Sequence, residues 1–154
     1  MIEEVSQQSS LENAPELGAI DLVAKDEIQA LMAKYMMLTD QGPDADAIVE
    51  LFVEDGVWDS GETYGTYDGR GEIFAFFKSM EGSMAYTKHI ATSAQLEVSG
   101  KVAKGSWQLI MLGETLEGET RWITGCYDNK FVKDVAGQWL FSHLKLRVEW
   151  QKTI

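Results

Sequence analysis

The chain has 154 residues, of which 45% are hydrophobic and 25% are charged, the composition of an ordinary globular domain. A chain of this length is expected to form one domain and to enclose a pocket without a disulfide or a metal. It carries 13 Lys and Arg against 25 Asp and Glu, which gives a formal net charge of −12. Nucleic acid and anionic membrane surfaces are therefore poor partners, because both are bound by excess positive charge.

Cysteine content and terminal residues limit the possible site types and the compartment. Cys126 is the only cysteine, which excludes an internal disulfide and a cysteine-based zinc cluster. No apolar run is long enough to cross a bilayer, and residues 1–8 contain acids where a signal peptide has basic residues. We therefore expect a cytoplasmic protein. Phosphate-loop, nucleophile-elbow and His-Glu-x-x-His motifs are absent, and two histidines without a cysteine cluster argue against a metal site.

A polar arm and one long helix are predicted first. Residues 1–16 have no hydrophobic period and are expected to form a flexible arm, which leaves residues 17–154 as the folded domain. From Asp21, apolar residues recur at helical spacing, with Asp21 or Asp26 as the N-terminal cap or as an anion in the first turn. Gly42-Pro43 ends the helix. The buried stripe consists of Ile28, Leu31, Met32, Tyr35, Met36 and Thr39.

Short elements follow, and then a run of long strands. Pro43 and Asp44 open a second helix with an apolar face that extends to Phe52, and Asp55-Gly56 is predicted as a turn. Strands are expected at residues 57–60 and 63–67, a third helix at 71–80, and long strands at 89–98, 103–112, 120–132 and 139–150. Helices followed by antiparallel strands predict an α+β domain, with the helices packed on one face of a curved sheet.

Asp40 occupies an apolar position of the first helix. It follows Ile28, Met32 and Met36 in steps of four along one helix face. It also lies at the helix C-terminus, where the macrodipole disfavours an anion by about 0.3–1 kcal/mol. Burial would increase this cost, and such costs are common at functional sites. A solvated turn formed by Asp40 and the next two residues is an equally good interpretation.

His89 and His143 are the only histidines, so imidazole chemistry must use one of them. His89 opens the first long strand, where a nearby carboxylate would hold it in one tautomer as a general base near neutral pH. Strict alternation places His89 opposite Leu96, so that both face the core only if a bulge intervenes. His143 shares a face with Lys145 and Arg147 and is expected to be structural or an interface residue.

The remaining candidates each have a structural and a functional interpretation. Tyr35 lies about 140° around the helix from Asp40 and fits a core tyrosine with its hydroxyl at the rim. Arg147 fits a solvated strand face, or an anion clamp at the pocket mouth. Seven Met and five Trp are many for this length, and although such residues are more often core, they would suit walls around an apolar ring. The expected walls are Met36, Trp58, Tyr67, Phe77, Trp107 and Met111.

The outer face of the sheet is a candidate interface. Trp139, Phe141 and His143 alternate along one side of the last strand, and the His89, Ala91, Ser93 and Gln95 set is small and polar. Exposed aromatic patches usually mark contacts, and oligomers are usually symmetric, so a homo-oligomer is predicted. In the other interpretation, the alternation phase is inverted and both aromatic side chains are core residues.

Several motifs in order resemble the SnoaL-like group of the nuclear-transport-factor-2-like superfamily. They are DEIQALMAKYMMLTD at residues 26–40, YDGRGEI at 67–73, the strand that opens at His89, and GCYD at 125–128 through GQW at 137–139. The resemblance covers about residues 22–150. It implies a cone-shaped α+β fold, in which three N-terminal helices pack on a strongly bent, mostly antiparallel six-stranded sheet around a deep apolar pocket.

Within that superfamily the chain is most similar to the branch of scytalone dehydratase, bile acid 7α-dehydratase and hexachlorocyclohexane dehydrochlorinase. The resemblance implies a catalytic dyad of Asp40 and His89, assisted by Tyr35 and more loosely by Arg147. It departs from the dehydratases near Met111 to Gly113, where this chain has no ionisable residue, so elimination and isomerisation both remain open.

The implied function is a cofactor-independent lyase or isomerase that acts on a small hydrophobic, cyclic substrate. The resemblance also implies a homo-oligomer, with a trimer ahead of a dimer. The alternative is a noncatalytic binding or assembly module of the same fold, which would not need the dyad. A hydrogen bond between the Asp40 and His89 side chains that lines a closed pocket would favour the enzyme.

Overall fold

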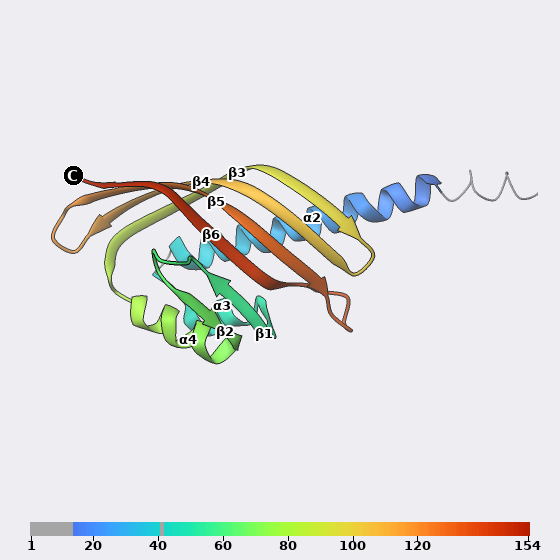
Figure 1. Cartoon of the computed structure of the whole chain (residues 1–154), viewed down its shortest axis with the longest axis horizontal. Helices are drawn as coiled ribbons and strands as arrows, with labels where there is room; N and C mark the ends of the chain where they lie inside the picture. Colours follow the sequence, from blue (N-terminus) through green and yellow to red (C-terminus); the bar gives the residue numbers. More distant parts are fainter. Residues whose placement is uncertain (1–13, 41) are drawn as a thin grey trace, which may run out of the picture.

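A computed structural model describes residues 14–40 and 42–154 of the chain (Figure 1). The elements, in chain order, are the helices and strands α2 (Ala14–Asp40), α3 (Ala45–Val49), β1 (Phe52–Asp59), β2 (Thr66–Asp68), α4 (Gly69–Met80), β3 (Met84–Ser99), β4 (Val102–Thr115), β5 (Thr120–Lys133) and β6 (Trp139–Thr153). None of the helices in the described ranges is long and apolar enough to cross a membrane.

The strands form one mixed sheet in the order β2-β1-β6-β5-β4-β3. Neighbouring strands are antiparallel except β1 and β6, which are parallel. Figure 1 shows the long strands β3 to β6 bending as one layer over α2, while α3 and α4 lie beside the short strands β1 and β2. The predicted α+β fold, with helices on one face of a strongly bent six-stranded sheet, is confirmed.

Helix α2 buries the predicted stripe against the sheet. Ile28, Met32 and Met36 are 0%, 2% and 7% exposed, and burying three such side chains contributes about 1.5–3 kcal/mol each to folding. The chain is already helical at Ala14, so Asp21 and Asp26 lie within the helix and the prediction of either as its N-terminal cap or first-turn anion is wrong. Of the arm predicted over residues 1–16, residues 1–13 lie outside the described part of the chain.

The segment after α2 follows its prediction only in part: α3 ends at Val49, and Phe52 begins β1 instead of extending the helix. Asp44 caps α3, because its Oδ1 accepts a hydrogen bond from the Ala47 N–H at 3.0 Å. The predicted turn at Asp55-Gly56, however, lies inside β1. The pairing of β1 with β6 shifts register within this stretch, and the space that a Cβ at Gly56 would occupy is 3.2 Å from the Phe141 carbonyl oxygen. Glycine is therefore present for close strand packing and not for a turn.

Arg70 fixes the start of α4 to β1. Its Nε and Nη2 atoms donate to the Phe52 carbonyl oxygen at 2.9 and 2.7 Å, and Nη1 donates to Glu50 at 3.2 Å. The planar guanidinium suits such paired donation. Since Phe52 is fully buried, this contact satisfies a main-chain carbonyl at the edge of the core. Arg70 in the YDGRGEI motif is therefore a structural residue.

A one-residue bulge divides strand β3. Between Thr92 and Gln95 the strand advances three residues while β4 advances two, from Gln108 to Ser106. Ser93 has a φ of 56°, in the left-handed region that non-glycine residues rarely adopt. The side-chain alternation of β3 therefore changes phase at Ser93.

The bulge places His89 on the inner face of the sheet. His89 pairs with Met111, and Leu96, beyond the bulge, pairs with Gly105 on the same face of β4. An odd-numbered and an even-numbered residue of one strand thus both face the core. Strict alternation allowed His89 and Leu96 both to face the core only if a bulge lay between them, and the structure contains that bulge.

The aromatic side chains predicted for the outer face lie in the core instead. Trp139 and Phe141 are only 6% and 0% exposed, so the alternation phase of β6 is the inverted one. Their prediction as an interface patch is wrong. The bulge divides the set that begins with His89: His89 and Ala91 pair with the inward-facing Met111 and Leu109, whereas Gln95 is exposed and pairs with Ser106 on the other face of β4. The outer face instead carries four other apolar side chains with exposures of 39% to 51%: Ile90, Ile110, Trp122 and Trp150.

Candidate active site

A cavity of about 530 Å³ lies between the inner face of the sheet and the helices, which is in the size range of small-molecule sites. Its walls come from α2, α4, β1 and the four long strands, and most of them are apolar or aromatic. The side chains that line its inner part include Tyr35, Thr39, Trp58, Phe77, His89, Leu109, Met111, Ile123, Tyr127 and Leu146.

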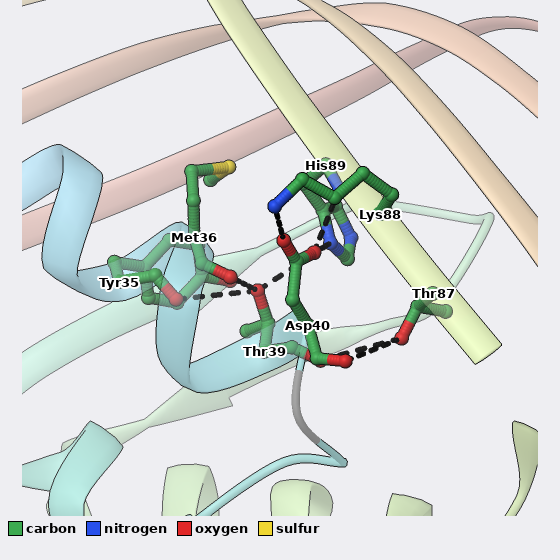
Figure 2. A network of polar contacts seen from close by, with 7 residues as sticks. All are labelled: Tyr35, Met36, Thr39, Asp40, Thr87, Lys88 and His89. Atoms are coloured by element: carbon green, nitrogen blue, oxygen red, sulfur yellow. Dashed lines mark hydrogen bonds and ion pairs between the residues drawn. The ribbon is translucent and has the colours of Figure 1, made fainter.

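Asp40 and His89 meet where the end of α2 contacts β3 (Figure 2). The His89 Nδ1 atom lies 2.8 Å from Asp40 Oδ1, and the His89 backbone N–H donates to the same oxygen at 2.7 Å. An ionised carboxylate only accepts hydrogen bonds, so the neutral ring carries its proton on Nδ1 and leaves the Nε2 lone pair free. Of the pair, His89 is the residue that lines the cavity.

The Asp40 carboxylate is stabilised in its charged form. Burial raises the pKa of this carboxyl, but hydrogen bonds from the His89 ring, the Lys88 ammonium and the His89 N–H together hold the pKa below its usual range. Lys88 Nζ donates to Oδ2 at 2.7 Å, and only 9% of the Asp40 side chain is exposed. Asp40 therefore remains an anion at neutral pH.

Two threonines support this corner of the fold (Figure 2). The Thr39 hydroxyl donates to the Met36 carbonyl oxygen at 2.8 Å, and its oxygen lies 3.5 Å from His89 Nδ1. The Thr87 hydroxyl reaches the Asp40 and Thr39 carbonyl oxygens at 3.4 and 3.5 Å, which are among the carbonyls that the end of a helix leaves unpaired. β3 and the last turn of α2 are thus held together on both sides of the dyad.

Tyr35 joins the same cavity from the previous turn of α2. Its hydroxyl oxygen accepts a hydrogen bond from the Trp58 indole N–H at 2.8 Å. An indole N–H can only donate, so the phenolic proton of Tyr35 remains available to a ligand. Burial raises the pKa of Tyr35 far above its usual value, and the bond from Trp58 offsets only part of this. Tyr35 can therefore donate a hydrogen bond but is a weak proton donor.

The predicted walls divide into two groups. Trp58, Phe77 and Met111 line the cavity, whereas Met36, Tyr67 and Trp107 do not. Met36 packs in the buried core. Tyr67 stacks on Phe76 with ring centroids 4.4 Å apart, and Trp107 contacts Phe131 at 6.0 Å between centroids. These three side chains belong to the core around the cavity.

Arg147 and His143 lie away from the cavity. The Arg147 side chain is 61% exposed and lies 3.2 Å from Glu149 and 3.9 Å from Asp128, on the outer face of the sheet. His143 Nε2 lies 3.5 Å from the Asp59 carboxylate. The structure does not bring Arg147 to the pocket mouth, because β6 directs residue 146 inward and residue 147 outward.

The site residues expected from the sequence did not include Lys88, Tyr64 or Arg121. Lys88 holds the second oxygen of Asp40, while Tyr64 and Arg121 line the cavity. Lys88 directly precedes His89 in the sequence, and this position could have indicated that it lies near Asp40. Arg121 lies two residues before inward-facing Ile123 in β5, and this spacing could have indicated it. Among residues 14–40 and 42–154, no group of three or more His, Cys, Asp or Glu side chains is arranged to hold a metal ion.

Solved structures share this fold at low sequence identity. A type 2 hexachlorocyclohexane dehydrochlorinase superposes with a TM-score of 0.78 at 23% identity, over 87% of this chain and 90% of its own. A candidate scytalone dehydratase from Novosphingobium aromaticivorans gives 0.79 at 22% identity, over 86% and 88%. A candidate aromatic ring hydroxylase from the same organism gives 0.76 at 24%, over 82% and 90%. No curated protein matches the chain in sequence.

Family membership follows from the sequence itself. The profile of the SnoaL-like domain matches residues 21–145, which include Asp40, His89 and most of the sheet. The match covers well over half of the chain, and the likeness to the solved structures agrees with it in fold. The chain belongs to the SnoaL-like family.

Proposed function

We propose that the protein is a cofactor-independent lyase that catalyses an elimination on a small hydrophobic, cyclic substrate, with isomerisation as the second choice. The observation that carries this proposal is the 2.8 Å contact between Asp40 Oδ1 and His89 Nδ1 beside an apolar cavity of about 530 Å³. A histidine oriented by a buried carboxylate at the wall of an apolar cavity is the arrangement that general base catalysis requires.

His89 is the proposed base. Its Nε2 lone pair removes a proton from a substrate carbon, the electrons of that C–H bond form the new double bond, and the leaving group departs with its bonding pair. Asp40 keeps the ring in the tautomer with the free Nε2 and stabilises the imidazolium that forms. In an isomerisation the same proton returns to another carbon of the substrate.

Tyr35 is the proposed hydrogen-bond donor to the oxygen or leaving atom that gains negative charge. Its hydroxyl oxygen already accepts from Trp58, so that its proton is directed elsewhere. The raised pKa favours donation of a hydrogen bond over transfer of the proton. This fits leaving groups that depart as stable anions.

The rival function is a noncatalytic binding or assembly module of the same fold. Such a module would need the cavity but not a base oriented by a carboxylate. Asp40 is an anion held at the C-terminus of α2, where the macrodipole opposes it. That unfavourable position, occupied to hold His89, supports the enzyme over the module.

The proposal can be tested without knowledge of the natural substrate. 5-Nitrobenzisoxazole is a small bicyclic compound that opens when a base removes its C3 proton, and the N–O bond breaks to give a coloured phenolate. The wild-type chain should accelerate this elimination, and His89→Gln should slow it by about 10²–10⁴-fold, the usual contribution of a positioned base.

His143→Gln is the matched control, because His143 is the other histidine of the chain and lies outside the cavity. It should retain the wild-type rate. An unaltered rate in His89→Gln, or an equal loss in both variants, would contradict the proposed base.

A further inference from the structure

We propose that Arg121 and Tyr64 form a second polar anchor in the cavity, which binds an anionic oxygen group of the substrate. The ligand class is then an apolar one- or two-ring compound that carries a single carboxylate or phenolate. The acidic carbon lies at His89 and the anionic group at Arg121. This inference rests on the proposed function only in that both place a ligand in the same cavity.

Both side chains line the cavity and both are half-buried. Neither forms a side-chain hydrogen bond or an ion pair with any part of the chain that the structure describes. The other two arginines do have partners: Arg70 holds Glu50 and a main-chain carbonyl, and Arg147 holds Glu149. A partly desolvated guanidinium without a partner is costly unless a ligand supplies the acceptor.

The two donors line the same cavity and are close enough for the charge of one to affect the other. Burial raises the pKa of the Tyr64 phenol, and the nearby positive charge of Arg121 opposes that rise. Tyr64 comes from the segment between β1 and β2, and Arg121 from β5, so the two approach the cavity from different elements. A phenol and a guanidinium together offer several donors, which suits a carboxylate or phenolate oxygen.

The residue beside Arg121 on β4 is a glycine that methionine side chains cover. Gly113 of β4 pairs with Arg121 on the inner face, and a Cβ at Gly113 would meet the end of the Met84 side chain at 2.7 Å. The Met84 and Met111 methyl groups fill this space, so the cavity wall next to Arg121 is apolar.

The register of the sheet gives the span of the ligand. His89 pairs with Met111 and Met111 with Ile123, and Arg121 lies two residues further along β5. Two strand spacings and two residues place the Cα atoms of His89 and Arg121 about 12 Å apart. After the lengths of both side chains are allowed for, one ring or two fused rings bridge this gap.

The charge of the rim limits the ligand to a single anionic group. Glu117 and Glu119 of the β4–β5 hairpin also line the cavity, and both are exposed. Their carboxylates would repel a second negative group near the mouth. Arg121 is the sole lysine or arginine that lines the cavity in the described ranges.

The test compares two ligands of the same shape. 2-Naphthoate and 2-naphthamide differ in charge, and their dissociation constants for the wild-type chain are measured by titration calorimetry at low salt. Naphthoate should bind about tenfold tighter or better, as expected for charge-assisted hydrogen bonds. In Arg121→Met this preference should fall to near unity, and in Tyr64→Phe it should fall a few-fold.

Arg147→Met is the matched control, because it removes an arginine outside the cavity and should keep the preference. The ratio of the two constants is insensitive to a general loss of folded protein. An unchanged ratio in Arg121→Met, no preference in the wild type, or no binding of either compound would overturn the inference. Asp40→Asn separates the two proposals, because it should lose the elimination activity and keep the naphthoate preference.

Discussion

A single carboxylate oxygen of Asp40 accepts two hydrogen bonds from His89, one from its backbone N–H at 2.7 Å and one from its ring at 2.8 Å. The first bond fixes the backbone of β3 against the end of α2, and the second fixes the imidazole on that backbone. Orientation of the ring is thus set by the same atom that sets its tautomer. This arrangement resembles the carboxylate support of histidine bases on unrelated folds.

Asp40→Asn should reduce the elimination of 5-nitrobenzisoxazole by about 10²–10⁴-fold, because the amide neither stabilises an imidazolium nor enforces the Nδ1–H tautomer. The rate at saturating probe, compared with the probe's dissociation constant, separates chemistry from binding. Binding should change little, since Asp40 itself does not line the cavity. A variant with wild-type turnover would show that Asp40 is only a structural residue.

Asp40 should also contribute stability that depends on pH. Its folded pKa is lowered, so the carboxylate stabilises the fold above its ordinary pKa of about 3.9, and this stabilisation is lost as the pH falls through the lowered value. Wild type should exceed Asp40→Asn by about 1–3 kcal/mol in free energy of unfolding at neutral pH. Urea unfolding at neutral pH and near pH 3 should show that the difference narrows in acid. A difference independent of pH would contradict the assignment.

Tyr35→Phe should lower the free energy of unfolding by about 1–3 kcal/mol, because it leaves the buried Trp58 indole N–H without an acceptor. Trp58→Phe should lower the free energy of unfolding less in the Tyr35→Phe variant than in the wild type, which a double-mutant cycle would measure. Tyr86→Phe is the control, since Tyr86 is 56% exposed and its change should be close to zero. Additive costs of the two buried substitutions would argue against the coupling.

Ser93→Val should destabilise the protein by about 1–2 kcal/mol, because a β-branched residue tolerates the left-handed backbone of the bulge poorly. Ser93→Gly should be neutral or slightly stabilising for the opposite reason. Thermal unfolding of the two variants beside the wild type provides the comparison. Equal midpoints would indicate that the bulge tolerates any side chain.

The outer face of the sheet is expected to contact other copies of the chain. Ile90 and Ile110 are cross-strand partners, and so are Ile110 with Thr124 and Thr124 with Trp150, so the exposed apolar side chains are adjacent. Light scattering at micromolar concentration should give about three times the 17.2 kDa mass of the monomer. Ile110→Lys with Trp150→Lys should lower the mass, whereas Lys104→Glu at the far end should not. A monomeric wild type would refute the prediction.

The elements with long, regular hydrophobic periods could be predicted from the sequence. The apolar stripe of α2 and the four long strands lie close to where periodicity placed them. The pairing of Asp40 with His89 was implied by the family resemblance. Spacing alone could not have supplied it, since the two residues are far apart in sequence and meet only through tertiary packing.

The errors come from places where tertiary contacts override a local pattern. Asp55-Gly56 is a common turn sequence but lies inside a strand, where a Cβ at Gly56 would be only 3.2 Å from the Phe141 carbonyl oxygen. Ser93 gave no signal of the bulge that turns His89 inward. Trp139 and Phe141 were assigned to the wrong face of β6, because a period of two does not indicate which face of a strand is buried. Arg121 was overlooked because an isolated arginine at a strand start is usually solvated.

The bulge at Ser93 makes β3 a strand with two independent halves. His89, before the bulge, lines the cavity. Leu96, after the bulge, does not line the cavity and packs against the hydrophobic core. Side chains around the ligand can therefore be exchanged without a shift in the far half of the strand. Deletion of the one extra residue would have the reverse effect: it would exchange inside and outside along half of β3, turning Lys88 into the cavity and His89 toward the solvent in one step.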